Sequence, residues 1–268
     1  MRPISQIHAK ISYRPAATCT ANMTDIADLC LHRSNYIDRF KKNFVKSALC
    51  ELRFPTVLEF GEQRLPGTII KALRKSYPTV EIGSEVSLGA PGPLSSSTVH
   101  VMRSLKGGWA ISFKQSALTL EVQSYTGYPE FRRRVQEVID ATSAVIDSDY
   151  WTRVGLRFVN LINKGDPVAG WVNPALLGPI DAGVFKLVAE YSGRLASISE
   201  DNGFLLQHGL RIEEGRDHPS YVVDVDAFCN TVTIDNTLEQ LDALHAQVFN
   251  VFEWALGEKS REYLLGDK

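Results

Sequence analysis

The sequence predicts an α+β fold in which antiparallel sheets pack against long helices. A repeated tripeptide is the first observation: Leu52-Arg53-Phe54 and Leu156-Arg157-Phe158 each lie inside an apolar run typical of a β-strand. The order of elements is the second, because each copy is followed by one helical stretch, several strand-like stretches and a long amphipathic helix. We therefore predict an internal duplication of a β-α-β(3–4)-α unit, with short turns between strands and the long helices on one face.

The chain divides into three predicted parts: an N-terminal extension of residues 1–43, a first α+β lobe of residues 44–149 and a second lobe of residues 150–268. Such a two-lobed body resembles the saddle of the TATA-binding-protein fold. The extension is expected to hold one helix, from a capping Thr24 to about Lys42. Packing of this helix on its own domain is favoured over docking onto another chain.

The first lobe begins with a strand that Pro55 stops. Apolar runs and alternation predict its strands over residues 45–54, 80–88, 99–103, 109–113 and 118–123. Helical spacing predicts helices over 61–77 and 128–146, the second with Pro129 in its first turn. Residues 89–97 are rich in Pro, Gly and Ser and predict a loop.

The second lobe follows a similar order. Its predicted strands cover residues 153–162, 185–191, 204–212 and 221–228. A short helix is expected over 173–177, where Gly178-Pro179 halts it, and a long final helix over 237–263.

Composition describes an ordinary globular protein: 268 residues, 44% hydrophobic and 22% charged. The net charge of −2 and the pI near 6.3 argue against a general nucleic-acid binder, whose domain is usually strongly basic. A local basic patch stays compatible with these values, because charge can be segregated on a surface.

Cysteine spacing and the N-terminus indicate a cytoplasmic protein. Cys19, Cys30, Cys50 and Cys229 lie too far apart for CxxC-type zinc or redox motifs, so reduced thiols are expected. No stretch approaches the roughly 20 apolar residues of a membrane span. No apolar segment of a signal peptide follows Met1.

Arg53 and Arg157 occupy equivalent points of the two predicted lobes. One hypothesis is that they grip one anion or an acidic partner segment, helped by Asn160. The favoured alternative is that each arginine pairs with a carboxylate across the sheet, for example Arg157 with Asp224 or Asp226.

Asp224-x-Asp226 places two carboxylates on the same face of a predicted strand. This pattern suits a divalent ion in a nuclease, yet no Glu-x-Lys or further acidic cluster accompanies it. Structural ion pairing is therefore favoured over a metal site.

Sequence signatures of catalysis are absent: there is no Walker A loop, no Gly-x-Gly-x-x-Gly and no Gly-x-Ser-x-Gly. The six histidines show neither i,i+4 nor His-x-His spacing. We accordingly predict no catalytic residue, no metal ligand and no cofactor.

Several short strings together resemble a sporadically distributed bacterial family of uncharacterised proteins. They are Ser47-Ala-Leu-Cys-Glu-Leu-Arg-Phe54, Leu118-Thr-Leu-Glu121 with Tyr125 and Phe131, Arg153-Val-Gly-Leu-Arg-Phe-Val-Asn160, Val223-Asp-Val-Asp226 and Leu244-His-Ala-Gln-Val-Phe249. The resemblance covers roughly residues 44–265, and its Gly-Leu-Arg-Phe string is the most distinctive part. It implies no established activity, but a patchy distribution is typical of mobile elements and phage-defence cargo.

These observations favour a non-enzymatic protein-interaction or accessory module of a bacterial system, in phage defence or a toxin–antitoxin-like operon. The expected partner is another protein encoded in the same operon, or a second copy of the chain, with no membrane involved. A nucleic-acid-binding protein is the first alternative, although its concave strands should carry lysines and arginines. A metal-dependent nuclease using Asp224 and Asp226, or another enzyme, is the second.

Overall fold

The computed structural model describes residues 29–37, 39–87, 95–106, 108–166, 168–186, 188–212 and 219–266. Over these residues the chain forms an α+β fold with nine strands in a single antiparallel sheet and five α-helices. The predicted class is therefore confirmed, with one continuous sheet.

The elements follow the chain in two similar series. The strands are β1 Val45–Arg53, β2 Thr79–Ser87, β3 Ser95–Arg103, β4 Trp109–Lys114, β5 Ala117–Val122, β6 Tyr150–Ile162, β7 Glu190–Ile198, β8 Asn202–Arg211 and β9 Ser220–Thr233. The α-helices are α1 Gly67–Leu73, α2 Tyr128–Ile146, α3 Gly178–Asp181, α4 Thr237–Ala255 and α5 Glu258–Leu265, and the 3-10 helices are η2 Leu58–Gly61, η3 Pro174–Leu176 and η4 Ile234–Asn236.

The strand order in the sheet is β2-β3-β4-β5-β1-β6-β9-β8-β7. Residues 45–122 supply the strands on one side and residues 150–233 those on the other, so that β1 and β6, the first strand of each series, meet in the centre. Their antiparallel register places Cys50 opposite Leu156 and Arg53 opposite Arg153. The two occurrences of Leu-Arg-Phe thus lie on neighbouring central strands.

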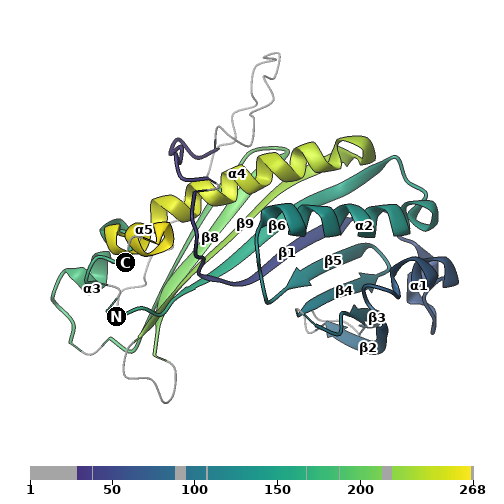
Figure 1. Ribbon diagram of the computed structural model, residues 1–268, viewed down its shortest axis with the longest axis horizontal. Helices are drawn as coiled ribbons and strands as arrows, with labels where there is room; N and C mark the ends of the chain where they lie inside the picture. The colour runs from purple at the N-terminus through teal and green to yellow at the C-terminus, as the bar shows by residue number, and fades with distance from the viewer. Residues whose placement is uncertain are drawn as a thin grey trace, which may run out of the picture.

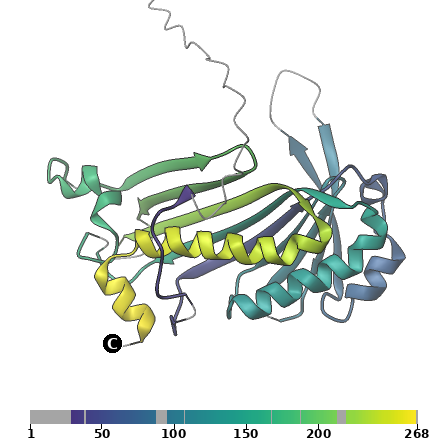
Figure 2. The same cartoon turned by 90° about the horizontal axis from the view of Figure 1, so that it is seen from above.

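The long helices α2 and α4 cover one face of the sheet (Figures 1 and 2). Both have 19 residues, and α2 has the predicted bounds and apolar stripe. Its buried residues are Phe131, Val135, Val138, Ile139, Thr142 and Ile146. Strands alternate accordingly: in β1 the side chains of Ala48, Cys50 and Leu52 are buried toward the helices, whereas the residues between them are partly exposed. The described part of the chain places no helix over the opposite face.

Several predicted boundaries are wrong, and Gly178-Pro179 begins α3 instead of halting a helix. The helix expected over 61–77 is only α1, because Pro66 stands at its N-cap and the buried Phe60 belongs to the separate turn η2. The strand expected over 185–191 begins instead at Glu190 and runs to Ile198, and Phe185 is exposed. An edge strand such as β7 alternates only weakly between apolar and polar residues. The apolar run over 185–191 therefore led to a wrong position for this strand. The loop expected over 89–97 ends earlier, because β3 starts at Ser95; residues 88–94 lie outside the described part.

The final helix, expected to run without a break from 237 to 263, divides into α4 and α5. Between them, the Gly257 amide donates to the carbonyl of Trp171 at 2.9 Å, and Leu256 bridges Val172. A distant segment therefore binds backbone groups that a continuous helix would use. The apolar periodicity of residues 237–263 does not indicate this tertiary contact.

The helix predicted over residues 24–42 is not present in the part that the structure describes, where residues 29–37 and 39–42 form turns and irregular backbone. Residues 24–28 lie outside that part. Contacts with distant elements hold the segment: the amide of Ser34 donates to Asn250 Oδ1 at 2.9 Å, and those of Lys41 and Lys42 donate to the carbonyl of Leu264. A backbone bonded in this way cannot also make helical bonds.

Cys30, Cys50 and Cys229 are reduced, not disulfide-bonded, and Cys19 lies outside the described residues. Burial within β1 raises the pKa of Cys50 to about 12, so this thiol is protonated and serves as core. Among the described residues, no helix combines the length and apolarity that a bilayer crossing requires.

Candidate functional site

The helix-free face carries a network of charged side chains across the three central strands β1, β6 and β9. Register places Asp224 and Asp226 of β9 opposite Val159 and Arg157 of β6. Both aspartates therefore share this face, as predicted. Three arginines and three carboxylates form the network: Arg53, Arg153, Arg157, Glu51, Asp224 and Asp226.

Arg157 binds Asp224 with two parallel hydrogen bonds, from Nε to Oδ1 at 2.8 Å and from Nη2 to Oδ2 at 2.6 Å. This fork geometry is the strongest form of an arginine–carboxylate pair. The bonds raise the pKa of Arg157 above its usual value. The Asp224 side chain is only 10% exposed and that of Arg157 is 43% exposed, so the carboxylate is screened from solvent by its partner.

Arg153 joins β1 to β9. Its Nη1 donates to Glu51 Oε1 at 2.6 Å, and its Nη2 lies 3.1 Å from Asp226 Oδ2. The guanidinium also lies over the ring of Phe228, 4.8 Å from its centroid. Gly155 creates the space for this arrangement, because a Cβ there would lie 2.3 Å from Arg153 Nη1. Burial raises the pKa of Asp226 above its ordinary value, an effect that Arg153 opposes.

Arg53 is the most exposed member of the network and pairs with Glu51 at 2.8 Å. It lies opposite Arg153 in the register, four residues along β6 from Arg157. The two arginines of the repeated tripeptide are therefore about 14 Å apart in the sheet. Arg157 pairs with Asp224 across the sheet, which is the arrangement of the structural alternative. Arg53 differs from that alternative, because it bonds to Glu51 of its own strand, a carboxylate that Arg153 also contacts.

The network is electrically balanced, with three arginines and three carboxylates. Within the described residues, no group of three or more His, Cys, Asp or Glu side chains is placed to hold a metal ion. The sequence interpretation missed Arg153 and Glu51, which complete the network. Alternation from Arg157 along β6 could have identified Arg153, and alternation from Arg53 along β1 could have identified Glu51.

Asn160 lies on the opposite, helix-covered face. It is 2% exposed and donates from Nδ2 to the carbonyl of Val223 at 3.3 Å. The predicted site residues therefore divide between two faces, and Asn160 lines a cavity instead of the charged network.

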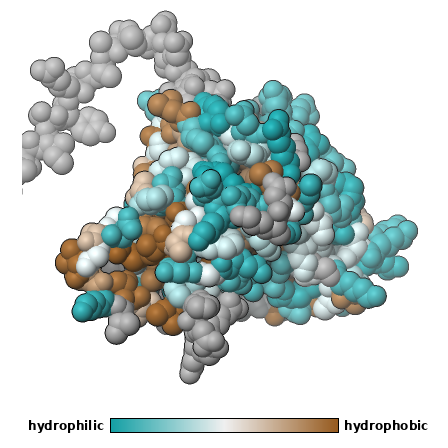
Figure 3. All heavy atoms as spheres, turned by 60° about the vertical axis from the view of Figure 1, so that its left-hand side comes forward, coloured by the Kyte–Doolittle hydropathy of each residue, from teal (hydrophilic) through white to brown (hydrophobic). Residues whose placement is uncertain are grey.

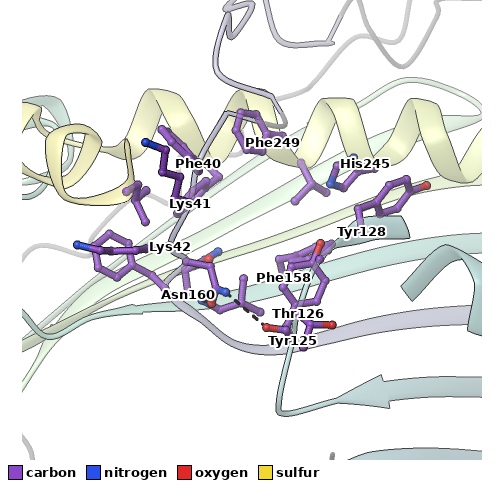
Figure 4. A pocket seen from close by; sticks show the side chains of 17 residues that line it. Phe40, Lys41, Lys42, Tyr125, Thr126, Tyr128, Phe158, Asn160, His245 and Phe249 are labelled. Atoms are coloured by element: carbon purple, nitrogen blue, oxygen red, sulfur yellow. Dashed lines mark hydrogen bonds between the residues drawn. The ribbon is translucent and has the colours of Figure 1, made fainter. Parts of the chain in front are cut away.

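That cavity, of about 190 Å³, is lined by the N-terminal segment 40–45 together with α4 and β6 (Figure 4). Its walls are mostly aromatic and aliphatic, from β6, α4 and the loop 125–128. The stack of His245 on Tyr128, with ring centroids 3.7 Å apart, forms one end. Tyr128 in turn donates its hydroxyl to Asp242 at 2.7 Å, and burial raises the pKa of this phenol. This wall is thus fixed by packing and by a hydrogen bond.

A third feature is the β7 edge of the sheet, one of its two edge strands together with β2. In the described part of the chain, β7 pairs with β8 alone, although it is nine residues long. Leu195 and Ile198 are 46% and 66% exposed on it, and Val184 and Phe185 are exposed just before it. Figure 3 brings the side with α3 forward and shows hydrophobic side chains gathered on part of it.

Comparison with known proteins adds no family: no family model matches the chain, and no curated protein matches it in sequence. The three features are therefore interpreted from their own geometry.

Proposed function

We propose that the protein is a non-enzymatic interaction module that binds an extended segment of another protein along β7. The observation that carries the proposal is the free edge of this strand. An edge strand presents a row of unpaired amides and carbonyls that can pair with another chain. Peptide recognition by strand addition uses such an edge for affinity and neighbouring side chains for specificity.

The side chains around β7 support this use. Natural edges are usually protected by lysine, proline or a short length. Here the nine residues include only two charges, Glu190 and Arg194, and neither lysine nor proline. The exposed Phe185, Leu195 and Ile198 supply apolar contacts for alternate side chains of a bound segment.

The charged network favours a protein partner over nucleic acid or a metal-dependent reaction. Its arginines are bonded to an equal number of carboxylates, so it offers little net charge to a phosphate backbone. Its aspartates are occupied by arginines, so a metal ion would have to displace them.

The proposed setting is the bacterial cytoplasm, with a partner from the same operon in a phage-defence or toxin–antitoxin-like system. The resemblance of the Gly155-Leu-Arg-Phe-Val-Asn160 string to a patchily distributed family supports this setting.

We also propose that residues 44–149 and 150–268 arose by duplication of one β-α-β(3–4)-α unit and form a saddle like that of the TATA-binding-protein fold. In each series the first strand is central, the later strands extend outward to an edge, and a 19-residue helix follows. The antiparallel β1–β6 pair is compatible with an approximate two-fold axis between the halves.

Affinity purification from the native host at low salt tests the proposal. Three baits are compared: the wild type, the double variant Leu195→Lys and Ile198→Lys, and the control variant Ile82→Lys. Ile82 lies on the opposite edge of the sheet and is 54% exposed. Native mass and the ratio of absorbance at 260 and 280 nm are measured together. We expect a partner at fixed stoichiometry with the wild type and the control, and its loss with the double variant.

Other outcomes are informative. Retention of the partner by the double variant would exclude β7 as the binding edge. A doubled mass of the wild type alone, lost in the double variant, would identify a second copy as the partner. Co-purified nucleic acid that salt releases would support the nucleic-acid alternative.

A further inference from the structure

The cavity beside Asn160 has the size of a small-molecule site, and it is separate from the edge of β7. It has a volume of about 190 Å³, and none of its lining residues belongs to β7. An apolar protein cavity of about 150 Å³ can bind benzene, whereas drug-sized ligands occupy about 300–1,000 Å³. The cavity therefore fits one aromatic ring with a short substituent.

Aromatic side chains from three parts of the chain line the cavity (Figure 4): Phe158 from β6, Phe249 from α4 and Tyr125 from the loop after β5. Tyr125 lies edge-on to Phe158, with ring centroids 5.3 Å apart. Phe40 lies beside Phe249, with centroids 5.6 Å apart. A further ring gains from offset-stacked or edge-to-face contacts with such neighbours, so the walls suit an aromatic ligand.

The charged side chains of the lining are directed to other partners, so the cavity suits a neutral ligand. The ammonium of Lys42 lies over the ring of Tyr263, 4.4 Å from its centroid. Lys41 runs along Gly266, where a Cβ would lie 3.3 Å from Lys41 Cδ, and the ring of His245 is stacked on a tyrosine. Among the described residues that line the cavity, none is aspartate or glutamate. A charged group placed there would lose its hydration without gaining an opposite charge.

The amide of Asn160 offers a polar group to a ligand. This side chain lines the cavity and is 2% exposed, and its Nδ2 donates to the carbonyl of Val223 at 3.3 Å. Its Oδ1 accepts no hydrogen bond from the described residues. A buried amide oxygen without a donor is rare and unfavourable. A ligand that donates one hydrogen bond at this point would satisfy it.

We propose that this cavity binds a small neutral molecule of the phenol type, with its ring among the aromatic side chains and its hydroxyl donating to Asn160 Oδ1. The apolar walls bind the ring, and the amide oxygen recognises the hydroxyl. This inference goes beyond the interaction function, because it uses no residue of β7.

Isothermal titration of the full-length protein with three single-ring probes tests the proposal. The probes are phenol, toluene, in which a methyl group replaces the hydroxyl, and benzoate, which carries a negative charge. We expect phenol to bind with a dissociation constant below about 1 mM, and benzoate to bind at least about tenfold more weakly. No binding of phenol at millimolar concentration, or binding of benzoate as tight as that of phenol, would overturn the proposal.

Two variants test whether phenol binds in this cavity. Asn160→Leu removes the acceptor and keeps a side chain of similar size, so it should weaken phenol at least about tenfold and retain toluene. Asn230→Leu is the matched control, since Asn230 lies in β9 outside the lining, and it should leave phenol unchanged. Val248→Phe fills the cavity from α4 and should abolish binding of both probes, with circular dichroism of each variant confirming the fold. Unchanged phenol affinity in Asn160→Leu or in Val248→Phe would show that the proposed site is wrong.

Discussion

At the residue scale, Gly155 illustrates how one small residue organises the charged network. Glycine in the interior of a central strand usually weakens it, because it has no side chain to pack. Here the guanidinium of Arg153 occupies the space above Gly155 and reaches Glu51 on one neighbouring strand and Asp226 on the other. The glycine of the Gly-Leu-Arg-Phe string therefore acts through the arginine two residues before it.

Gly155→Ala tests this role. A Cβ would lie 2.3 Å from Arg153 Nη1, so the guanidinium must move away from its carboxylates. We expect the free energy of unfolding to fall by about 1–2 kcal/mol in urea titrations. Gly83→Ala in β2, where a Cβ meets open space, should change it by less than about 0.5 kcal/mol.

Gly155→Ala in an Arg153→Met background separates the effect of displacing the guanidinium from the effect of alanine on the strand itself. If displacement of the guanidinium is the cause, Gly155→Ala should then cost almost nothing, and the two effects should be strongly coupled. An equal cost in both backgrounds would contradict this explanation.

At the element scale, the first turn of α2 is stabilised by charge. Glu130 accepts hydrogen bonds from Arg133 at 2.8 Å and Arg134 at 2.7 Å, and it lies near the positive end of the helix. The bonds from Arg133 hold the pKa of Glu130 at about 2. A depressed carboxyl pKa contributes stability above the ordinary pKa near 4.5, and this contribution is lost as the pH falls toward 2.

Glu130→Gln should therefore reduce stability at neutral pH and lose its effect in acid. Because the side chain is partly exposed, we expect a difference of only about 0.5–1 kcal/mol at pH 7. The difference from wild type should shrink between pH 4.5 and 2, as followed by urea titration at each pH. A difference that does not vary with pH would show that Glu130 contributes through packing.

The break between α4 and α5 is set by a close approach of two backbones. A Cβ on Gly257 would lie 2.2 Å from the carbonyl oxygen of Gly170, and this neighbour is backbone, which cannot turn aside. We expect Gly257→Ala to lower the free energy of unfolding by about 2–4 kcal/mol. Gly67→Ala at the start of α1, with nothing within 4 Å, should be neutral or slightly stabilising. Thermal and urea denaturation of both variants provides the comparison.

At the scale of the whole molecule, the central β1–β6 pair joins the two halves. Each of these strands is hydrogen-bonded on both sides, β1 to β5 and β6, and β6 to β1 and β9. Buried side chains of both halves belong to one hydrophobic core. Separation of the halves would expose the edges and apolar faces of both central strands, so we infer that they unfold together.

Native-state hydrogen exchange in increasing urea checks this cooperativity. The most protected amides of β5 in the first half and of β9 in the second should converge on one free energy of opening, equal to the global value. Amides of β7 at the edge should exchange at lower free energy. If the amides of β5 and those of β9 reach two different free energies of opening, the halves are two independent folding units.

Local sequence determined the elements whose apolar pattern is strong. The six-residue stripe of α2, the central strands β1 and β6, and the shared face of Asp224 and Asp226 follow from helical and strand periodicity. The sequence favours a pairing of Arg157 with Asp224 or Asp226, because a carboxylate is the simplest partner for an arginine within a sheet. The structure shows Asp224 as that partner.

Tertiary structure alone decided the strand order, the break at Gly257, the irregular course of residues 39–42 and the cavity beside Asn160. In each case the deciding partner lies far away in the sequence: Gly170 and Trp171 for the break, Leu264 for the N-terminal segment, α4 for the cavity. Periodicity reports which face of an element is apolar. It carries no information about which distant backbone or side chain meets that face, and such contacts determine where the features of the candidate site lie.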